Sequence, residues 1–152
     1  MQRNLELDLK TILFSALMMF AVSMLLSFAL LLFIGIVQLG ATLNLQTALE
    51  NTSAIGHSNG FRLAAHTIHL LVASFVGYRL ANKLHIRAIP HIWIATLLAV
   101  FIHFFVHAAM GIGLSQLLTE IRFLELPVMM VFGTFIGLHF YFWRRHGVLI
   151  KA

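Results

Sequence analysis

Long apolar stretches alternate with short charged segments along this chain. The stretches without Asp, Glu, Lys or Arg are residues 11–49, 63–78, 88–119 and 126–143. A helix needs about 20 apolar residues to cross the hydrocarbon core of a bilayer. The first and third stretches exceed this length, and the fourth is just long enough. The second reaches it when Arg79 extends its side chain toward the lipid headgroups.

The pattern therefore predicts an all-α protein, an integral membrane four-helix bundle. The predicted spans lie near residues 11–39, 61–83, 89–116 and 126–143. The first span follows Arg3 and Lys10, as in a signal peptide, but its apolar run is about twice the usual 7–15 residues. We therefore expect this helix to be retained. No change in composition marks a soluble domain, so residues 1–152 are predicted to form a single polytopic membrane domain.

The connections between the spans contain turn-forming and polar residues. The sequence ALENTSAIGHSNG at 48–60 predicts an outer loop, with Ser58 or Asn59 as the cap of the second helix. Pro90 suits the first turn of the third helix. Residues 117–127 are predicted to form a second outer loop, in which Glu125 precedes the fourth helix.

The composition agrees with a membrane protein. Of the 152 residues, 61% are hydrophobic and only 10% are charged, whereas soluble domains carry about 25% charged residues. The net charge of +5 comes from basic residues that flank the spans. Such residues orient helices and meet anionic lipid, so nucleic acid is not expected as a partner.

The distribution of basic residues predicts the orientation. With both the N- and C-termini in the cytoplasm, the inner side holds all of the 10 Lys and Arg residues except Arg62 and Arg122. This bias obeys the positive-inside rule. We expect a multi-pass protein of the membrane, with the bacterial inner (plasma) membrane as its location.

Two histidine pairs interrupt the apolar runs. His66 and His69 lie in AAHTIHLLVASF at 64–75, and His103 and His107 lie in AVFIHFFVHAAM at 99–110. Spacings of three and four residues place each pair on one helix face. At about 1.5 Å per residue, both pairs fall at similar depths in the outer half of the bundle. If the second and third spans are neighbours, the four imidazoles converge, and His57 in the loop lies above them.

The neighbouring residues set the context of these pairs. Thr96, Ala99 and Met110 are predicted to share the face of His103 and His107. Small residues that permit close helix contact form one row on the second span and another on the fourth: Ala73, Gly77 and Ala81, and Gly133 and Gly137. The remaining histidines are expected outside the cluster. His139 points away from the glycine row, and the three at the cytoplasmic interface, predicted to be solvated, are His85, His91 and His146.

Four imidazoles permit several kinds of chemistry. They could bind haem b through one histidine from each of two helices, or bind a transition metal such as Zn, Cu, Fe or Ni. They could also form a proton relay or a quinone site. Without any cofactor, a buried histidine can simply hydrogen-bond across helices, which stabilises a bundle by about 0.6 kcal/mol. The candidate ligands are His66, His69, His103 and His107, with His57 as a further metal ligand.

The sequence lacks the residues that several other functions of membrane proteins require. The chain has no cysteine, so thiolate-held iron–sulfur clusters and Cys-linked haem are excluded. No catalytic motif occurs, and no predicted span has an Asp or Glu at its middle, which disfavours ion-coupled transport. The four-span size and histidine pairs resemble the haem-bearing membrane anchors of respiratory enzymes. That resemblance implies a membrane subunit of a redox complex and not its catalytic chain.

The sequence thus predicts a small membrane subunit with a histidine-lined site for haem b or a transition metal. The alternatives are a cofactor-free partner or assembly subunit and a small oligomeric transporter or channel. The expected partners are the lipid bilayer and either other membrane subunits or further copies of the chain.

Two short matches indicate a repeated hairpin. SFVG at 74–77 matches TFIG at 134–137, and GIVQL at 35–39 resembles GIGLSQL at 111–117. The first pair lies in the second and fourth spans, and the second pair lies at the ends of the first and third. Together they suggest that two helical hairpins repeat, with a shorter outer loop in the second.

Overall fold

The described residues are helical almost throughout. The computed structural model describes residues 8–85, 88–113 and 121–149, which form helices and no strand. The helices are α1 (Leu9–Thr42), α2 (Leu45–Gly56), α3 (Asn59–Leu84), α4 (Ala88–Ala109) and α6 (Ile121–Leu149). Of these, α1, α3, α4 and the Leu124–Arg145 part of α6 are long and apolar enough to cross a membrane. The predicted all-α fold with four spans is confirmed.

The helix boundaries differ from the prediction at two places. Helix α4 ends at Ala109, short of residue 116, because Gly111 adopts a left-handed φ of 88° that ends the helix. Helix α6 begins at Ile121, so Glu125 and Pro127 lie within it and not in a loop. Membrane helices tolerate such an internal proline where neighbouring groups satisfy the freed carbonyl.

The predicted outer loop at 48–60 is also wrong for most of its length, because α2 occupies it. The Asn44 side chain caps this helix by accepting a hydrogen bond from the Thr47 backbone N–H at 3.1 Å. Helix α2 then folds back along the end of α1, where Asn51 donates to Gln38 Oε1 at 3.3 Å. The cap of α3 is the predicted one: the Phe61 N–H donates to Ser58 Oγ at 3.2 Å.

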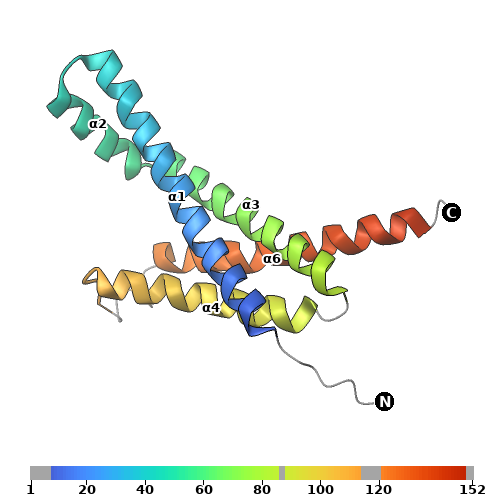
Figure 1. The fold of residues 1–152 in the computed structure, drawn as a ribbon. Helices are drawn as coiled ribbons and strands as arrows, with labels where there is room; N and C mark the ends of the chain where they lie inside the picture. Colours follow the sequence, from blue (N-terminus) through green and yellow to red (C-terminus); the bar gives the residue numbers. More distant parts are fainter. Residues whose placement is uncertain (1–7, 86–87, 114–120, 150–152) are drawn as a thin grey trace.

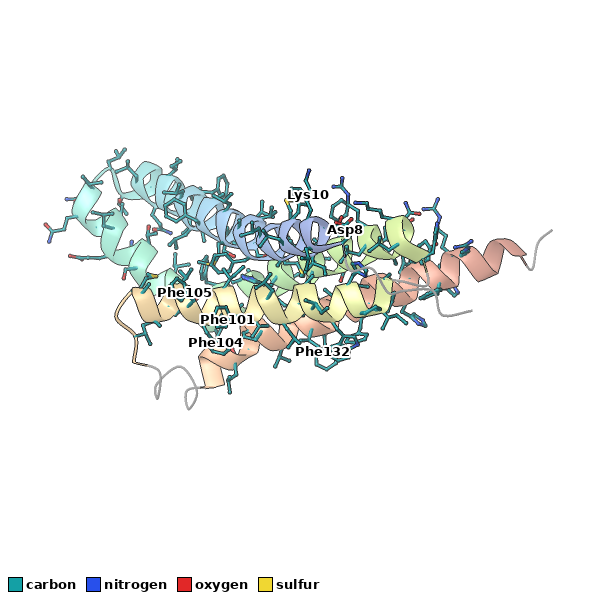
Figure 2. The ribbon with its side chains drawn as sticks, turned by 60° about the horizontal axis from the view of Figure 1, so that its bottom comes forward. Asp8, Lys10, Phe101, Phe104, Phe105 and Phe132 are labelled. Carbon is teal, nitrogen blue, oxygen red and sulfur yellow. The ribbon has the colours of Figure 1, made fainter. Side chains whose placement is uncertain are left out.

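The four long helices alternate in direction, so the start of α1 and the end of α6 lie at the same end of the molecule (Figure 1). We call this the basic end, because Lys10, Arg79, Lys83, Arg144 and Arg145 lie there. Its cytoplasmic location stays a prediction. Large apolar side chains cover the outer surface, as for Phe101, Phe105 and Phe132, which are 60% or more exposed (Figure 2). A surface of this kind needs a bilayer around it.

The tightest contact of the bundle joins α3 to α6, which are not neighbours in sequence. A Cβ added at Gly137 would overlap the Ser74 carbonyl oxygen, and one added at Gly77 would overlap that of Thr134. The same holds for Gly133 against the Leu70 carbonyl. The predicted rows of small residues therefore form this contact, and α3 lies against α6 more extensively than against α4. Helices α3 and α4 are also in contact, as the short connection between them implied, but less extensively.

This contact is reciprocal, as a two-fold relation requires. Ser74 of α3 contacts Gly137 of α6, and Thr134 of α6 contacts Gly77 of α3. Thr134 and Gly137 stand 60 positions after Ser74 and Gly77, so the two contacts are equivalent. The buried residues of α1 show a similar relation to α4. Thr11, Ile12, Ser15, Ala16, Met19 and Ser23 correspond to His91, Ile92, Ala95, Thr96, Ala99 and His103, each 80 positions later. The α3–α6 contact joins the same positions as the match of SFVG to TFIG, whereas the match of GIVQL to GIGLSQL falls partly on residues 114–117, which lie outside the described residues.

The glycine contact gives a direct stability prediction. We expect Gly137→Ala to lower the free energy of unfolding by about 1–3 kcal/mol, because the added methyl group separates two packed backbones. Gly40→Ala is the matched control, since a Cβ at Gly40 meets nothing within 4 Å; it should leave stability unchanged or raise it slightly. The measurement is SDS-induced loss of helical ellipticity in mixed micelles. Equal behaviour of the two variants would contradict the assigned contact.

Candidate functional site

The bundle core contains buried polar side chains among apolar ones. Its central part consists mainly of apolar and small residues, among them Met19, Val76, Ala99 and Met130. Toward the end opposite the basic end, three helices contribute fully buried polar side chains. We call Ser23 of α1, His69 of α3 and His103 of α4 the buried histidine layer; their exposed fractions are 0%, 1% and 0%.

Two contacts between helices indicate that Ser23, His69 and His103 lie at similar depth in the bundle. Lys83 of α3 donates a hydrogen bond to Thr11 of α1, so these two residues lie at the same level. Ser23 lies 12 residues from Thr11 along α1, and His69 lies 14 residues from Lys83 along α3. These distances agree within one helical turn at about 1.5 Å per residue. The ring of His103 lies edge-on to Phe20, one turn before Ser23, with 6.5 Å between centroids.

His69 has a defined hydrogen-bonding state. Its Nδ1 lies 2.8 Å from the carbonyl oxygen of Ala65. A carbonyl can only accept, so Nδ1 carries a hydrogen, and in the neutral ring Nε2 holds a lone pair. Nε2 is completely buried, and no hydrogen-bond partner for it occurs among residues 8–85, 88–113 and 121–149. The Oγ of Ser23 is buried without a partner in the same part of the chain.

His66, one turn from His69, pairs with a carboxylate. Its Nε2 lies 3.1 Å from Glu125 Oε2 of α6, and the same oxygen lies 3.7 Å from Arg62 Nε. The exposed fractions of the side chains fall from 52% for Arg62 to 25% for Glu125 and 14% for His66. Exposure therefore decreases from Arg62 through Glu125 and His66 to His69, which is 1% exposed.

The other residues predicted for the site or its helix face differ in their burial. His107 is half-buried; its Nδ1 donates to the His103 carbonyl oxygen at 2.9 Å, and the two rings lie 4.3 Å apart. Thr96 and Ala99 are buried on the same helix face as His103, as predicted, whereas Met110 is 73% exposed beyond the end of α4. His57 is exposed at the C-terminus of α2.

The histidines near the basic end correct one expectation. His91 was predicted to be solvated, but it is 1% exposed, and its Nε2 accepts a hydrogen bond from the Asp8 backbone N–H at 3.0 Å. The start of α1 covers this ring, which hydropathy alone does not reveal. His85 is exposed and lies 2.5 Å from the Tyr141 hydroxyl. His139 is exposed, whereas the side chain of His146 lies outside the described residues.

The arrangement limits what the histidines can hold. Within the described residues, no group of three or more His, Asp or Glu side chains is placed to bind a metal ion. Haem b needs space for the porphyrin beside each ligating nitrogen. Such space would leave the rings accessible, but His69 and His103 are 1% and 0% exposed. As arranged, these residues do not fit a haem.

Sequence reasoning located the buried pair but missed two partners of the site. Glu125 was assigned to a loop, although a carboxylate two residues before a predicted span can lie in its first turns. Ser23 lies in an apolar run, where a serine indicates only a helix contact. Comparisons of the chain with protein-family models, with curated proteins and with solved structures found no match.

Replacing Ser23 tests whether the buried histidine layer lowers the stability of the fold. We expect Ser23→Ala to raise the free energy of unfolding by about 1 kcal/mol, because it removes a buried hydroxyl without a partner. Ser74→Ala is the control, since the Ser74 hydroxyl donates to the Leu70 carbonyl oxygen at 2.7 Å; it should not stabilise. The measurement is again SDS-induced unfolding. A destabilised Ser23→Ala variant would show that this hydroxyl has a partner in the folded protein.

Proposed function

We propose that this multi-pass membrane protein binds and releases a proton at a buried histidine, His69, as part of a proton relay. The observation that carries the proposal is the buried Nε2 of His69, which has no hydrogen-bond partner in the described part of the chain. Ionisable residues inside a membrane are costly, so they are functional candidates by default.

The geometry of His69 suits this role. Imidazole changes charge near neutral pH and can both accept and donate a proton. A proton that binds Nε2 leaves the bond from Nδ1 to the Ala65 carbonyl intact. The ring can therefore change its protonation state without losing the hydrogen bond that orients it.

The residues outside His69 supply an entry for protons. Glu125 is 25% exposed and contacts both Arg62 and His66, so it can exchange protons with the aqueous phase and with the imidazole of His66. His66 and His69 lie one turn apart on α3. Further inward, the Thr96 hydroxyl donates to Thr134 Oγ1 at 3.3 Å, and both threonines are buried. Thr134 packs against Gly77, eight residues beyond His69 on α3, so this pair lies about 12 Å further into the bundle.

The other functions remain as alternatives with different consequences. A haem b or transition-metal site at His66, His69, His103 and His107 stays a prediction, and it requires the helices to open around the rings. A cofactor-free partner or assembly subunit would tolerate replacement of each histidine. Only 6% of the residues in the most apolar stretch of α1 are buried within this chain. The bilayer covers the others, and membrane partners or further copies of the chain stay a prediction.

The test is a pH titration of the histidines by NMR. We expect one ¹⁵N-histidine signal of the detergent-solubilised protein to titrate and to be absent from the His69→Gln variant, because His69 Nε2 binds the proton. Glu125→Gln should change the titration or exchange rate of that signal, since it removes the entry carboxylate. His57→Gln and His139→Gln are controls, because both side chains are exposed and remote from the Glu125–His66 pair.

Two results would count against the proposal. A His69 signal that stays constant between about pH 5 and 8 would assign the residue a purely structural role. Soret and sharp reduced α and β bands in the visible spectrum of the same sample, or stoichiometric bound metal, would favour the cofactor alternatives instead.

A further inference from the structure

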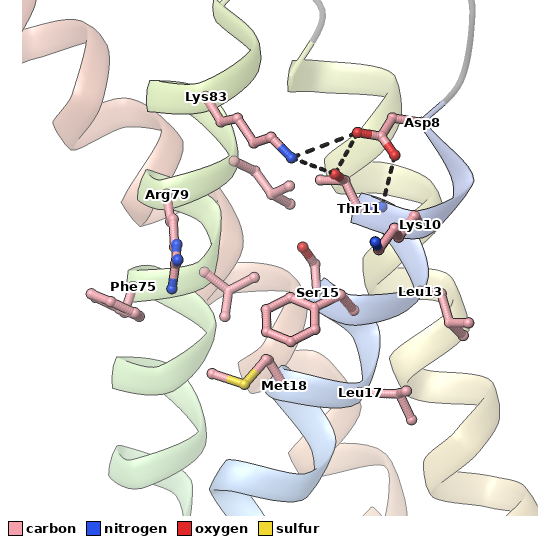
Figure 3. Close-up of a pocket in the computed structure, with 13 residues that line it drawn as sticks. Asp8, Lys10, Thr11, Leu13, Ser15, Leu17, Met18, Phe75, Arg79 and Lys83 are labelled. Carbon is pink, nitrogen blue, oxygen red and sulfur yellow. Dashed lines mark hydrogen bonds and ion pairs between the residues drawn. The ribbon is translucent and has the colours of Figure 1, made fainter.

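A cavity opens between α1 and α3 at the basic end, away from the buried histidine layer. Its volume is about 510 Å³, which lies within the range of small-molecule sites. All of its lining residues belong to the start of α1 and the end of α3. The walls are apolar, with side chains that include Phe14, Met18 and Phe75, and the charged residues among the lining are Asp8, Lys10, Arg79 and Lys83 (Figure 3).

One cation of this set is neutralised within the protein. Lys83 Nζ lies 3.6 Å from Asp8 Oδ2 and donates to Thr11 Oγ1 at 2.7 Å. The Thr11 hydroxyl and backbone N–H both donate to the Asp8 carboxylate. These hydrogen bonds lower the pKa of the Asp8 carboxyl below its usual value, so it remains ionised beside Lys83.

Two cations remain without such a partner. Lys10 and Arg79 form no hydrogen bond or ion pair with any residue of the described ranges, and both are exposed. They approach the cavity from opposite sides, Lys10 from α1 and Arg79 from α3 (Figure 3). Three cations and one carboxylate leave the lining with a net charge of +2.

The second hairpin shows that the bundle does not require this charge. The offsets of 80 between α1 and α4 and of 60 between α3 and α6 pair Lys10 with Pro90, Arg79 with His139 and Lys83 with Trp143. There, Trp93 of α4 packs against Phe135 of α6, with ring centroids 5.1 Å apart. The positions of the second hairpin that correspond to Lys10, Arg79 and Lys83 therefore carry no Lys or Arg.

We propose that the α1–α3 cavity binds one anionic phospholipid, with its phosphate between Lys10 and Arg79 and an acyl chain along Phe14, Met18 and Phe75. An apolar groove below unpaired cations complements both parts of such a lipid. Basic pockets between membrane helices at the cytoplasmic side bind anionic headgroups in this way. The predicted orientation places this cavity in the cytoplasmic leaflet, whose surface is anionic.

The test is native mass spectrometry of the full-length, detergent-solubilised protein titrated with dioleoyl phosphatidylglycerol. We expect one tightly bound lipid and much weaker binding of the zwitterionic dioleoyl phosphatidylcholine. Lys10→Gln/Arg79→Gln should weaken phosphatidylglycerol binding about 25-fold, since each cation near a membrane surface contributes about a five-fold effect. Lys10→Arg/Arg79→Lys should retain the binding, because both charges stay in place.

Arg144→Gln/Arg145→Gln is the matched control. It removes two charges at the same end of the molecule, but neither residue lines the cavity. It should bind phosphatidylglycerol as the parent protein does. Because Lys10 and Arg79 are exposed, their replacement should leave helical ellipticity and the elution volume unchanged. If the double variant does not fold, Arg79→Gln alone should show a loss of about five-fold.

Three outcomes would overturn the proposal. Equal binding of the two lipids would remove the role of the headgroup charge. Equal losses in the two double glutamine variants would indicate general attraction to the basic end. Binding of sn-glycerol 3-phosphate as tight as that of phosphatidylglycerol would assign the cavity to a free phosphate compound, since no acyl chain would be needed.

Discussion

The close approach of the α3 and α6 backbones determines most of this structure. Apolar side chains do not drive helices together in a membrane, because the lipid is equally apolar; close packing does. Gly77, Gly133 and Gly137 allow the two backbones to touch. This contact aligns α3 and α6 in the same direction and sets their register. That register brings His66 of α3 to Glu125 of α6, so the polar entry at one end of the bundle depends on glycines near its middle.

Much of the fold could be predicted from sequence because membrane spans obey simple rules of length and charge. The four spans, the rows of small residues and the burial of His69 and His103 follow from apolar length and helical periodicity. Helix α2 could not be predicted in this way, since its cap at Asn44 and its packing against α1 leave no apolar run to detect. The partners of His66 and His91 depend on which helices meet, and a sequence pattern within one helix does not contain that information.

The polar residues of the bundle fall into two groups, those with hydrogen-bond partners and those that are buried without them. At the basic end, Asp8, Thr11 and Lys83 bond to one another, and His91 receives the Asp8 backbone N–H. These groups hold α1 against α3 and α4 and are explained by stability alone. His69 Nε2 and Ser23 Oγ differ, because they are buried without hydrogen-bond partners in the described residues. Natural proteins keep such costly groups mainly where function requires them.

The buried positions of the two hairpins correspond, 80 residues apart in α1 and α4 and 60 apart in α3 and α6, yet their polar residues differ. Ser23 corresponds to His103, Lys10 to Pro90, and His69 to Met129. A symmetric dimer of two-span chains would carry every polar group in two equivalent copies. Here the two halves are parts of one chain, so each position could diverge separately. Within the described residues, the buried histidine layer and the charged cavity therefore each draw on positions whose counterparts in the other hairpin carry different side chains.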